Sequence, residues 1–411
     1  MYPNKQDKKR LVVVGNGMAG IKTVEEVLTA VPDDYEITVF GNEPYGNYNR
    51  ILLSSVLSGE KAVGDIFTND RQWYADHGIT LYTGDEKTVE IIDRKRRKVI
   101  AKDGTVAEYD RLLIATGSKP IIADIPGNKL AGIVSFRDIT DVTTMLTYAE
   151  SHCNAVVLGG GLLGLEAASG LVARGMNVTV VHNKPFLLNR QLDEAAAKML
   201  QSELEKRGIR FTLAVGLKRL ISNDSNHISS VLFEDDTEIP CDLFVMAIGV
   251  QPNIALAQKA GIYCERGIVV TDTLQTYDPS IYAVGECIQH RGQTFGLVAP
   301  LFEQAKVCAT HLSGHGVGSY LSLPNATKLK ITGINVFSSG NFSGNDTSEH
   351  IRFCDPEMGI YKKIVVNNNR IQGIVLYGDI ADSAWYQTLF EEKADIARYR
   401  QHLVFGLAYA A

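Results

Sequence analysis

No stretch of this 411-residue sequence approaches the run of about 20 apolar residues that a membrane-spanning helix requires. The polar segment 1–10 also lacks the apolar core of a signal peptide. An excess of positive charge is missing too, and the net charge of −6 gives no electrostatic reason to expect nucleic acid or an anionic membrane as a partner. These absences predict a cytoplasmic protein that binds neither.

Cysteine is scarce, and the few cysteines lie far apart, with no C-x-x-C pair among them. They are Cys153, Cys241, Cys264, Cys287, Cys308 and Cys354. The chain is long enough for two or three domains, and thiols scattered along such a chain are typical of reduced cytosolic cysteines. The spacing indicates neither a disulfide framework nor a metal cage, so no metal site is predicted.

Glycine is abundant by contrast, and three glycines near the start of the chain form a G-x-G-x-x-G motif. They are Gly15, Gly17 and Gly20, and they follow an apolar run, 11–14, that predicts a buried parallel strand. The first glycine makes a tight turn, the second lets a pyrophosphate approach the backbone, and the third packs a helix on the strand. The N-terminus of that helix then offers its free N–H groups to the phosphates.

A second predicted strand, 36–40, leads to Glu43, which lies about 20 residues past the motif, where a ribose hydroxyl finds its acceptor. An ordinary glycine turn is the alternative, but the strand, the helix and the acid together predict dinucleotide binding. Arg50 follows beside two tyrosines. It is either a solvated loop charge or, as its place after the ribose acid favours, a contact to the bound dinucleotide.

The same unit recurs beyond a linker marked by Pro120, Pro126 and Gly127. Residues 155–158 predict a buried strand, and Gly159, Gly161 and Gly164 form a second G-x-G-x-x-G before a helix that ends at Gly175. Two such units imply two dinucleotides, one held permanently and one that exchanges.

The ribose end of the second unit differs from that of the first. After the strand 178–181 come His182 and then Lys184, where a carboxylate would favour NAD by binding the 2′-hydroxyl and repelling a 2′-phosphate. His182 and Lys184 can tolerate that phosphate, but neither forms an arginine clamp. The sequence leaves NADH and NADPH open.

Other segments complete the outline. The strand 112–117 ends in small residues, the stretch 79–106 predicts a small antiparallel layer, and the apolar strand 243–249 is expected to return to the first domain. A strand that ends at Gly285 and Glu286, at a helix start, offers an acid and backbone amides to a polyol or phosphate.

The tail, 321–411, is expected to form a smaller α+β domain. The expected strands are 328–336, 361–366 and 370–377, with a hairpin turn at 367–369 and helix around 384–390.

The two glycine motifs, together with the stretches 115–117, 249–253 and 283–286, resemble the pyridine nucleotide-disulfide oxidoreductase superfamily. Within it, five stretches resemble the flavin module at the N-terminal end of the assimilatory NAD(P)H-nitrite reductase large subunit. They are 48–55, 299–304, 327–333, 361–363 and 378–379. Rubredoxin and ferredoxin reductases share most of these motifs.

The resemblance implies an α/β fold with two Rossmann-like dinucleotide-binding domains of the glutathione-reductase type and a C-terminal α+β domain. The implied domains are 1–118 and 243–320 for FAD, 119–242 for NAD(P)H and 321–411 for the C-terminal domain. That last domain is expected to cover the flavin or to form a homodimer surface.

The resemblance also implies site residues. Those expected along FAD are Gly15, Gly17, Ala19, Glu43, Arg50, Thr116, Gly117, Arg137 and Glu286, and those expected at the nicotinamide nucleotide are Gly159, Gly161, Leu162, Leu163 and Glu166. Further expected cofactor contacts are Met18, Gly20, Val89, Ala115, Gly164, His182, Lys184, Gly249, Gly285 and Pro300. Glu166, as a positioning group for the nicotinamide, and Arg50 are the expected catalytic residues.

One departure from the resemblance bears on mechanism. Peroxidase and CoA-disulfide reductase relatives carry a redox cysteine where this chain has Ser55, so electrons are expected to leave straight from the flavin. The expected activity passes hydride from NADH or NADPH to FAD and electrons to an iron–sulfur or sirohaem domain or a small carrier protein. Cysteine clusters for such a domain are missing, so the chain is expected to be a truncated module or a stand-alone relative. The alternatives are a rubredoxin or ferredoxin reductase and, in another class, a flavin-binding redox sensor.

Overall fold

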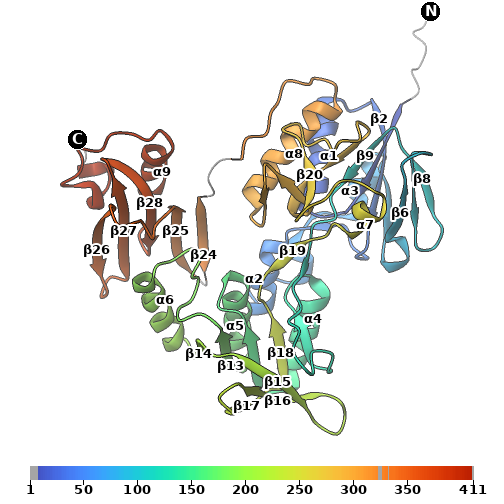
Figure 1. Ribbon diagram of the computed structural model, residues 1–411. Coiled ribbons are helices and arrows are strands. Elements are labelled where there is room, and N and C mark those ends of the chain that lie inside the picture. Colours follow the sequence, from blue (N-terminus) through green and yellow to red (C-terminus); the bar gives the residue numbers. More distant parts are fainter. Residues whose placement is uncertain (1–7, 323–325, 332, 410–411) are drawn as a thin grey trace, which may run out of the picture. The chain divides into compact units, whose positions relative to one another are not determined.

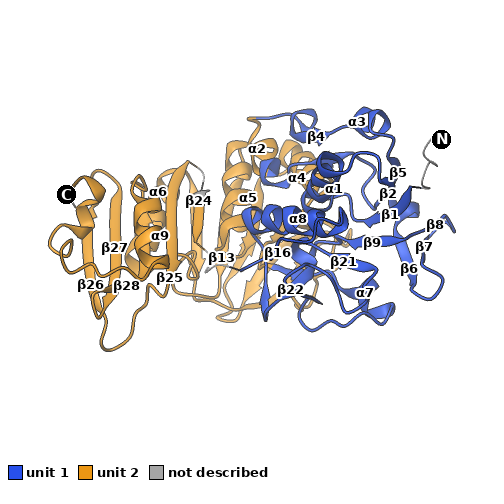
Figure 2. Cartoon of the chain, turned by 90° about the horizontal axis from the view of Figure 1, so that it is seen from above, with its two compact units in different colours: residues 1–53, 61–120, 250–322 blue, residues 54–60, 121–249, 323–411 orange. Residues whose placement is uncertain are grey.

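The computed structural model describes residues 8–322, 326–331 and 333–409 (Figure 1). Within these residues the chain folds into two compact units (Figure 2). Unit 1 falls within residues 1–53, 61–120 and 250–322, and unit 2 within residues 54–60, 121–249 and 323–411. Each unit is therefore assembled from segments that are distant in sequence.

Unit 1 is built on a five-stranded parallel sheet with the strand order β21-β9-β1-β2-β5. Its strands are β1 (Lys9–Val14), β2 (Tyr35–Gly41), β5 (Thr80–Thr83), β9 (Arg111–Ile114) and β21 (Ile281–Ala283). The helices α1 (Met18–Ala30) and α8 (Val298–Leu312) lie side by side (Figure 1). Residues 11–14 of β1 and 112–114 of β9 are apolar and buried, as expected for the centre of a parallel sheet.

Smaller elements surround this sheet. They are the antiparallel β6 (Val89–Asp93), β7 (Lys98–Ala101) and β8 (Val106–Glu108); β20 (Ile268–Val270), β22 (Ile288–His290) and β23 (Gln293–Thr294); the pair β3 (Asn47–Tyr48) and β4 (Phe67–Asn69); and the short helices α3 (Arg71–Asp76) and α7 (Ala255–Lys259). The predicted antiparallel layer 79–106 is wrong for its first strand, because β5 pairs parallel with β2. An edge strand of a parallel sheet is only half covered, so its sequence alternates like an antiparallel strand.

Unit 2 contains a second parallel sheet, with the order β11-β18-β12-β13-β14. Its strands are β11 (Ile133–Ser135), β12 (Asn154–Leu158), β13 (Asn177–His182), β14 (Ile209–Leu213) and β18 (Leu243–Met246), and its helices are α4 (Ile139–Ser151), α5 (Leu162–Ala173) and α6 (Glu194–Lys206). A three-stranded sheet follows β14, formed by β15 (Leu217–Ser222), β16 (Ile228–Phe233) and β17 (Glu238–Pro240). The short α2 (Leu53–Ser58) packs on α5, where Gly170 leaves room for Leu57.

The expectation that strand 243–249 returns to the first domain is wrong. Strand β18 pairs in parallel with both β11 and β12 and is buried throughout. A continuous apolar run shows that a strand is buried on both faces but does not show which of two sheets it joins. The chain re-enters unit 1 only at Val250, where β19 (Val250–Pro252) pairs antiparallel with β10 (Ser118–Pro120).

The C-terminal part of unit 2 is a five-stranded antiparallel sheet, in the order β24-β25-β28-β27-β26, with one helix. Its elements are β24 (Thr327–Ile331), β25 (Ile334–Gly340), β26 (Glu349–Asp355), β27 (Ile360–Asn367), β28 (Arg370–Tyr377) and α9 (Ser383–Glu391). The single strand expected over 328–336 is a hairpin of two strands, and β26 was not predicted. The hairpin turn at 367–369 is confirmed: Asn368 and Asn369 have φ of 49° and 54°, which asparagine tolerates in a tight two-residue turn.

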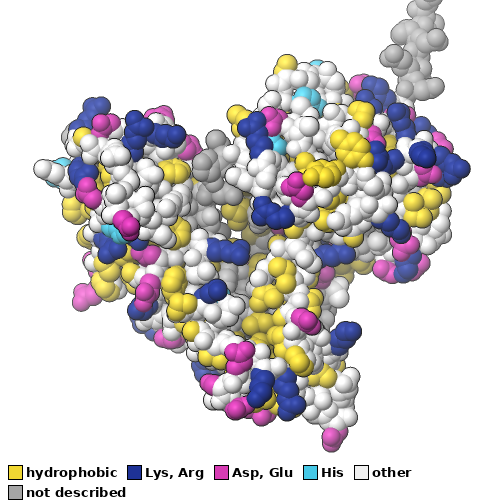
Figure 3. Space-filling view, in the orientation of Figure 1, with side chains coloured by type: hydrophobic (Ala, Val, Ile, Leu, Met, Phe, Trp, Pro, Cys, Tyr) yellow, Lys and Arg dark blue, Asp and Glu magenta, His cyan; other side chains and the backbone are white. Residues whose placement is uncertain are grey.

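Of the helices that these described ranges contain, none combines the length and apolarity needed to cross a bilayer. On the face drawn in Figure 3, acidic and basic side chains are interspersed. This mixture agrees with the modest net charge of −6.

Candidate dinucleotide sites

The first glycine turn has the backbone that a pyrophosphate needs. Gly15 has φ +120°, and a Cβ there would lie 2.1 Å from the carbonyl oxygen of Ala115. A Cβ on Gly20 would lie 2.6 Å from the carbonyl oxygen of Gly15, which shows how closely α1 packs on the turn. At Gly17, the N-cap of α1, an added Cβ would meet nothing within 4 Å. The helix start is therefore open to a phosphate, as FAD binding requires.

The predicted ribose acid and Arg50 lie together after β2. Arg50 forms an ion pair with the carboxylate of Glu43, and its guanidinium carbon lies 5.1 Å from the ring centroid of Tyr48. The Tyr48 hydroxyl donates to the other carboxylate oxygen of Glu43 at 2.7 Å. The Glu43 side chain is 19% exposed. The carboxylate is thus held in place at the strand end where a ribose would lie.

A second wall of this site comes from two other strand ends. Gly285 lies close to the first turn, since a Cβ on it would be 3.0 Å from the Ala19 methyl group. Ser118 donates to the Glu286 carboxylate at 2.9 Å, and Thr116 donates to the Asn253 carbonyl at 2.8 Å. Residues 285–287 form one 3₁₀ turn, not the start of a longer helix as expected.

Four other residues in the predicted set are placed as follows. Val89 is buried in β6, and Pro300 lies in the first turn of α8. Arg137 and Gly249 belong to unit 2, after β11 and β18 respectively. Their expected cofactor contacts stay predictions.

Sequence reasoning missed Gln304. This side chain is fully buried in α8, and its Oε1 accepts the Gly285 N–H at 2.9 Å. It therefore fixes the turn that carries Glu286. The available signal was a glutamine among the apolar residues of 298–312, because buried amides need a specific partner.

The second glycine turn reproduces the first. Gly159 has φ +126°, and a Cβ there would lie 2.3 Å from the Ala247 carbonyl oxygen. A Cβ on Gly164 would lie 1.9 Å from the Gly159 carbonyl oxygen. Gly161 caps α5 and, like Gly17, has nothing within 4 Å of an added Cβ. The helix therefore opens with Leu162 and Leu163 at a site shaped for a second pyrophosphate.

His182, predicted to follow the strand 178–181, is the last residue of β13, and its ring lies back against the glycine turn. A Cβ on Gly160 would lie 2.9 Å from the ring atoms Cγ and Cδ2 of His182 and 2.8 Å from Leu187. Burial lowers the pKa of His182 from its usual range, which the side chain of Asn189 partly opposes. Lys184 is exposed nearby. The neutral imidazole therefore replaces the acid of the first unit.

Glu166 lies in α5, two residues past the last motif glycine. Burial raises the pKa of this carboxyl to about 7, so that it titrates near neutral pH. A carboxyl with such a perturbed pKa at a helix start beside a ligand site is a candidate functional group.

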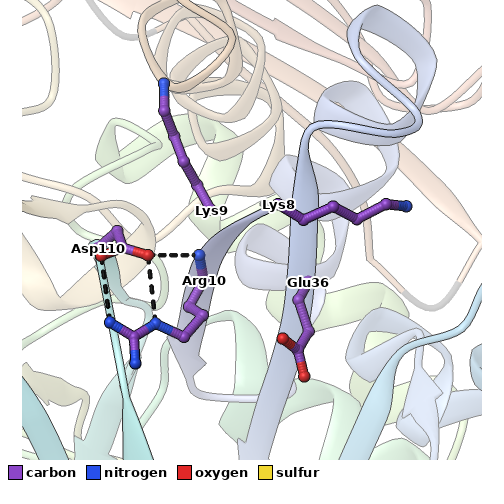
Figure 4. A pocket seen from close by; sticks show the side chains of 5 residues that line it. All are labelled: Lys8, Lys9, Arg10, Glu36 and Asp110. Carbon is purple, nitrogen blue, oxygen red and sulfur yellow. Dashed lines mark hydrogen bonds and ion pairs between the residues drawn. The ribbon is translucent and has the colours of Figure 1, made fainter. Parts of the chain in front are cut away.

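The cavity shown in Figure 4 is a different feature. It has a volume of about 690 Å³ and is lined by Lys8, Lys9, Arg10, Glu36 and Asp110. Arg10 and Asp110 pair across it, with Nε and Oδ2 3.2 Å apart. These residues lie at the N-terminal ends of β1, β2 and β9, whereas the glycine turn follows the C-terminal end of β1. Ligands of parallel sheets bind at the C-terminal ends of strands, so this cavity is separate from the dinucleotide site.

Comparison with known proteins agrees with this geometry. The family model of the pyridine nucleotide-disulphide oxidoreductases matches residues 9–309, and that of the rubredoxin NAD+ reductase C-terminal domain matches residues 326–394. A nitrite reductase [NAD(P)H] of Bacillus subtilis (strain 168) is 46% identical over 390 residues, covering 95% of this chain and 48% of the relative. An assimilatory nitrate reductase electron transfer subunit of the same organism is 43% identical over 400 residues, covering 97% of this chain and 51% of the relative.

The fold is also found in an experimental structure. Putidaredoxin reductase, in its covalent complex with putidaredoxin, matches with a TM-score of 0.84 at 23% identity, covering 95% of this chain and 94% of that one. This likeness confirms the predicted fold class. The chain spans about half the length of the two Bacillus relatives.

Proposed function

This chain belongs to the pyridine nucleotide-disulphide oxidoreductase family, and we propose that it is the NAD(P)H-oxidising module of an assimilatory nitrite reductase. Its cofactors are FAD and NADH or NADPH, and its partner is an electron acceptor. We propose an iron–sulfur or sirohaem domain as that acceptor, and the cytoplasm as its compartment because all six cysteines are free. Homodimer formation stays a proposal. The division into four domains also stays a proposal, but the end of the NAD(P)H domain moves from residue 242 to Gly249.

One observation carries the proposal: two glycine turns with open helix starts lie at the ends of two separate parallel sheets. When bound, FAD would take up two electrons as a hydride from NADH or NADPH and release them one at a time to an acceptor. In unit 1, Gly17 leaves space for the pyrophosphate, while Glu43, oriented by Tyr48 and Arg50, accepts the ribose hydroxyl.

In unit 2, Gly161 and the start of α5 bind the pyrophosphate of NADH or NADPH. Glu166 orients the nicotinamide end. None of these residues is a thiol, and Ser55 donates to Glu60 at 3.2 Å on the surface. The proposed electron path therefore bypasses cysteine.

The experiment supplies this 411-residue chain with NADH and either ferricyanide or nitrite. We expect steady ferricyanide reduction and no ammonia, because six-electron nitrite reduction needs metal centres that store charge. Among the described residues, no cluster of His, Cys, Asp and Glu can hold a metal ion. Ammonia formed by this chain alone, or a slow and stable complex with NADH in place of turnover, would refute the proposal, and the second result would favour the redox sensor.

A stand-alone rubredoxin or ferredoxin reductase is the second candidate. Its support is the match of residues 326–394 to the rubredoxin NAD+ reductase C-terminal domain. Comparing rubredoxin, ferredoxin and a sirohaem-containing nitrite reductase fragment as acceptors separates the two candidates. The faster acceptor at equal concentration identifies the branch.

A further inference from the structure

The Tyr361-Lys362-Lys363 segment of β27 contains two adjacent lysines that are almost completely buried, at 6% and 4% exposure. Successive side chains of a strand point to opposite faces of the sheet, so each lysine needs its own anion. Lys362 pairs with Asp379 at 2.7 Å, inside the C-terminal part of the chain. Lys363 pairs with Asp193 at 3.1 Å, which belongs to the nucleotide-binding part of unit 2.

Asp193 serves two elements at once. Its Oδ1 accepts the Ala196 N–H at 3.2 Å and so caps the N-terminus of α6. Its Oδ2 accepts the Tyr361 hydroxyl at 2.8 Å and the ammonium of Lys363. One carboxylate therefore joins the C-terminal sheet to α6, which lies beside that sheet in both ribbon views (Figures 1 and 2).

The segment between His182 and α6, residues 183–193, is here called the nucleotide loop. The Leu188 N–H donates to the Gly160 carbonyl at 2.9 Å, and Leu187 packs against Gly160, the second residue of the glycine motif. Leu188 has φ +49°, a conformation that a leucine adopts only when its surroundings enforce it. The Leu192 N–H returns to the Leu188 carbonyl at 2.9 Å, one residue before Asp193.

The nucleotide loop is thus fixed at the glycine motif and at Asp193. We propose that Tyr361 and Lys363 are positioning residues, through which the docked C-terminal sheet sets the nucleotide loop and with it the affinity for NADH or NADPH. This inference rests on the proposed function, because it takes the second glycine turn as the NAD(P)H site. It gives the C-terminal sheet a role in nucleotide binding through residues that touch no nucleotide.

The test compares Lys363→Met with Lys362→Met in the FAD-containing chain. The two lysines are neighbours, equally buried and each paired with a carboxylate, so Lys362→Met controls for the loss of a buried ion pair. We expect Lys363→Met to raise KM for NADH, and the calorimetric Kd for NAD+, by about tenfold with kcat nearly unchanged. Lys362→Met should leave both constants within about twofold of wild type, a change below 0.5 kcal/mol.

Tyr361→Phe provides a milder second variant, because it removes one hydroxyl and leaves the ion pair. It should raise the same two constants by a smaller factor. Hydrogen exchange of the Leu188 and Leu192 amides, measured without nucleotide, should be faster in Lys363→Met and unchanged in Lys362→Met.

Equal effects of Lys362→Met and Lys363→Met on Kd and exchange would overturn the inference, since they would reflect a general loss of stability. Unchanged Kd in Lys363→Met and Tyr361→Phe, with normal binding by wild type, would overturn it as well. Failure of the wild-type chain to bind NAD+ and NADH would instead refute the proposed function, and the inference with it.

Discussion

The two glycine turns share one backbone design and differ at the end of the strand that follows. In unit 1 that strand leads to Glu43, held by Tyr48 and Arg50. In unit 2 it ends at His182, whose ring lies against the turn itself. A ribose bound as proposed would meet a fixed carboxylate in the first site and no carboxylate at this position in the second. This difference is consistent with the proposal that unit 1 retains its FAD, whereas unit 2 releases its nicotinamide nucleotide after each cycle.

Valine at the second motif glycine should abolish each site separately. Gly17 and Gly161 have extended φ of −88° and open space beyond, so valine fits the folded chain and only blocks the pyrophosphate. Gly17→Val should reduce bound FAD, measured by absorbance, below about a tenth of wild type, a loss above 1.4 kcal/mol. Gly161→Val should keep its FAD and lose NADH-dependent dye reduction. Normal FAD content in Gly17→Val, or release of FMN on heating wild type, would contradict the assignment of the first site.

Removal of the charge at Glu166 should stabilise unit 2 at alkaline pH. Because burial raises the pKa of this carboxyl from 4.5 to about 7, its contribution to stability is present at low pH and is lost as the pH rises through 7. Glu166→Gln should therefore raise the free energy of unfolding at pH 8 by up to about 3 kcal/mol and by little at pH 4. Urea unfolding at both values measures this, and a pH-independent difference would show that Glu166 is not the group responsible. The same variant should flatten any change in kcat/KM for NADH near pH 7.

His182→Glu should convert the second site toward the first. The new carboxylate would repel the 2′-phosphate of NADPH, so kcat/KM for NADPH should fall several-fold while that for NADH changes little. Lys184→Gln is the matched variant, because it removes a positive charge two residues further along the chain without adding a negative one. If kcat/KM for NADPH is unaffected by His182→Glu, the residue does not face the ribose.

Replacement of all six cysteines by serine should have the smallest effect. Burial raises the pKa of Cys287 to about 11, so its thiol is protonated at neutral pH and is a poor nucleophile. Its Sγ donates to the Val284 carbonyl at 3.2 Å, which a serine hydroxyl can replace. Ferricyanide reduction should persist at a rate close to that of wild type. Loss of this activity with FAD retained would place a thiol on the electron path.

The sequence was most informative where chemistry restricts the backbone. Gly15 and Gly159 adopt φ values that other residues avoid, and the motif around each predicted a strand, a turn and a helix that the structure contains. Asn368 and Asn369 predicted the hairpin turn for the same reason, because asparagine tolerates positive φ. Glu43 and Arg50 could be expected near one another because both follow the same strand.

The sequence was least informative about long-range partners, where several strands or side chains could form the same contact. Strand β18 could fill either parallel sheet, since both need a buried apolar strand. The pairing of β10 with β19 joins three-residue segments too short to show periodicity. Gln304 and Asp193 were missed because their roles depend on backbone groups and side chains brought together by folding. Such long-range partners leave no local pattern.

The β10–β19 pair has a consequence for how this chain can be rearranged. Lys119 lies opposite Gln251, and the Ile121 N–H donates to the Gly249 carbonyl at 3.0 Å, so residues 121–249 leave and return at one point. A segment whose ends already meet adds little closure entropy to its host, whatever its length. For unit 1, the whole insertion is equivalent to a tight turn. Residues 121–249 could therefore be exchanged for the corresponding segment of a relative with a different nucleotide preference. We expect the parallel sheet of unit 1 to keep its strand register in such a recombinant chain.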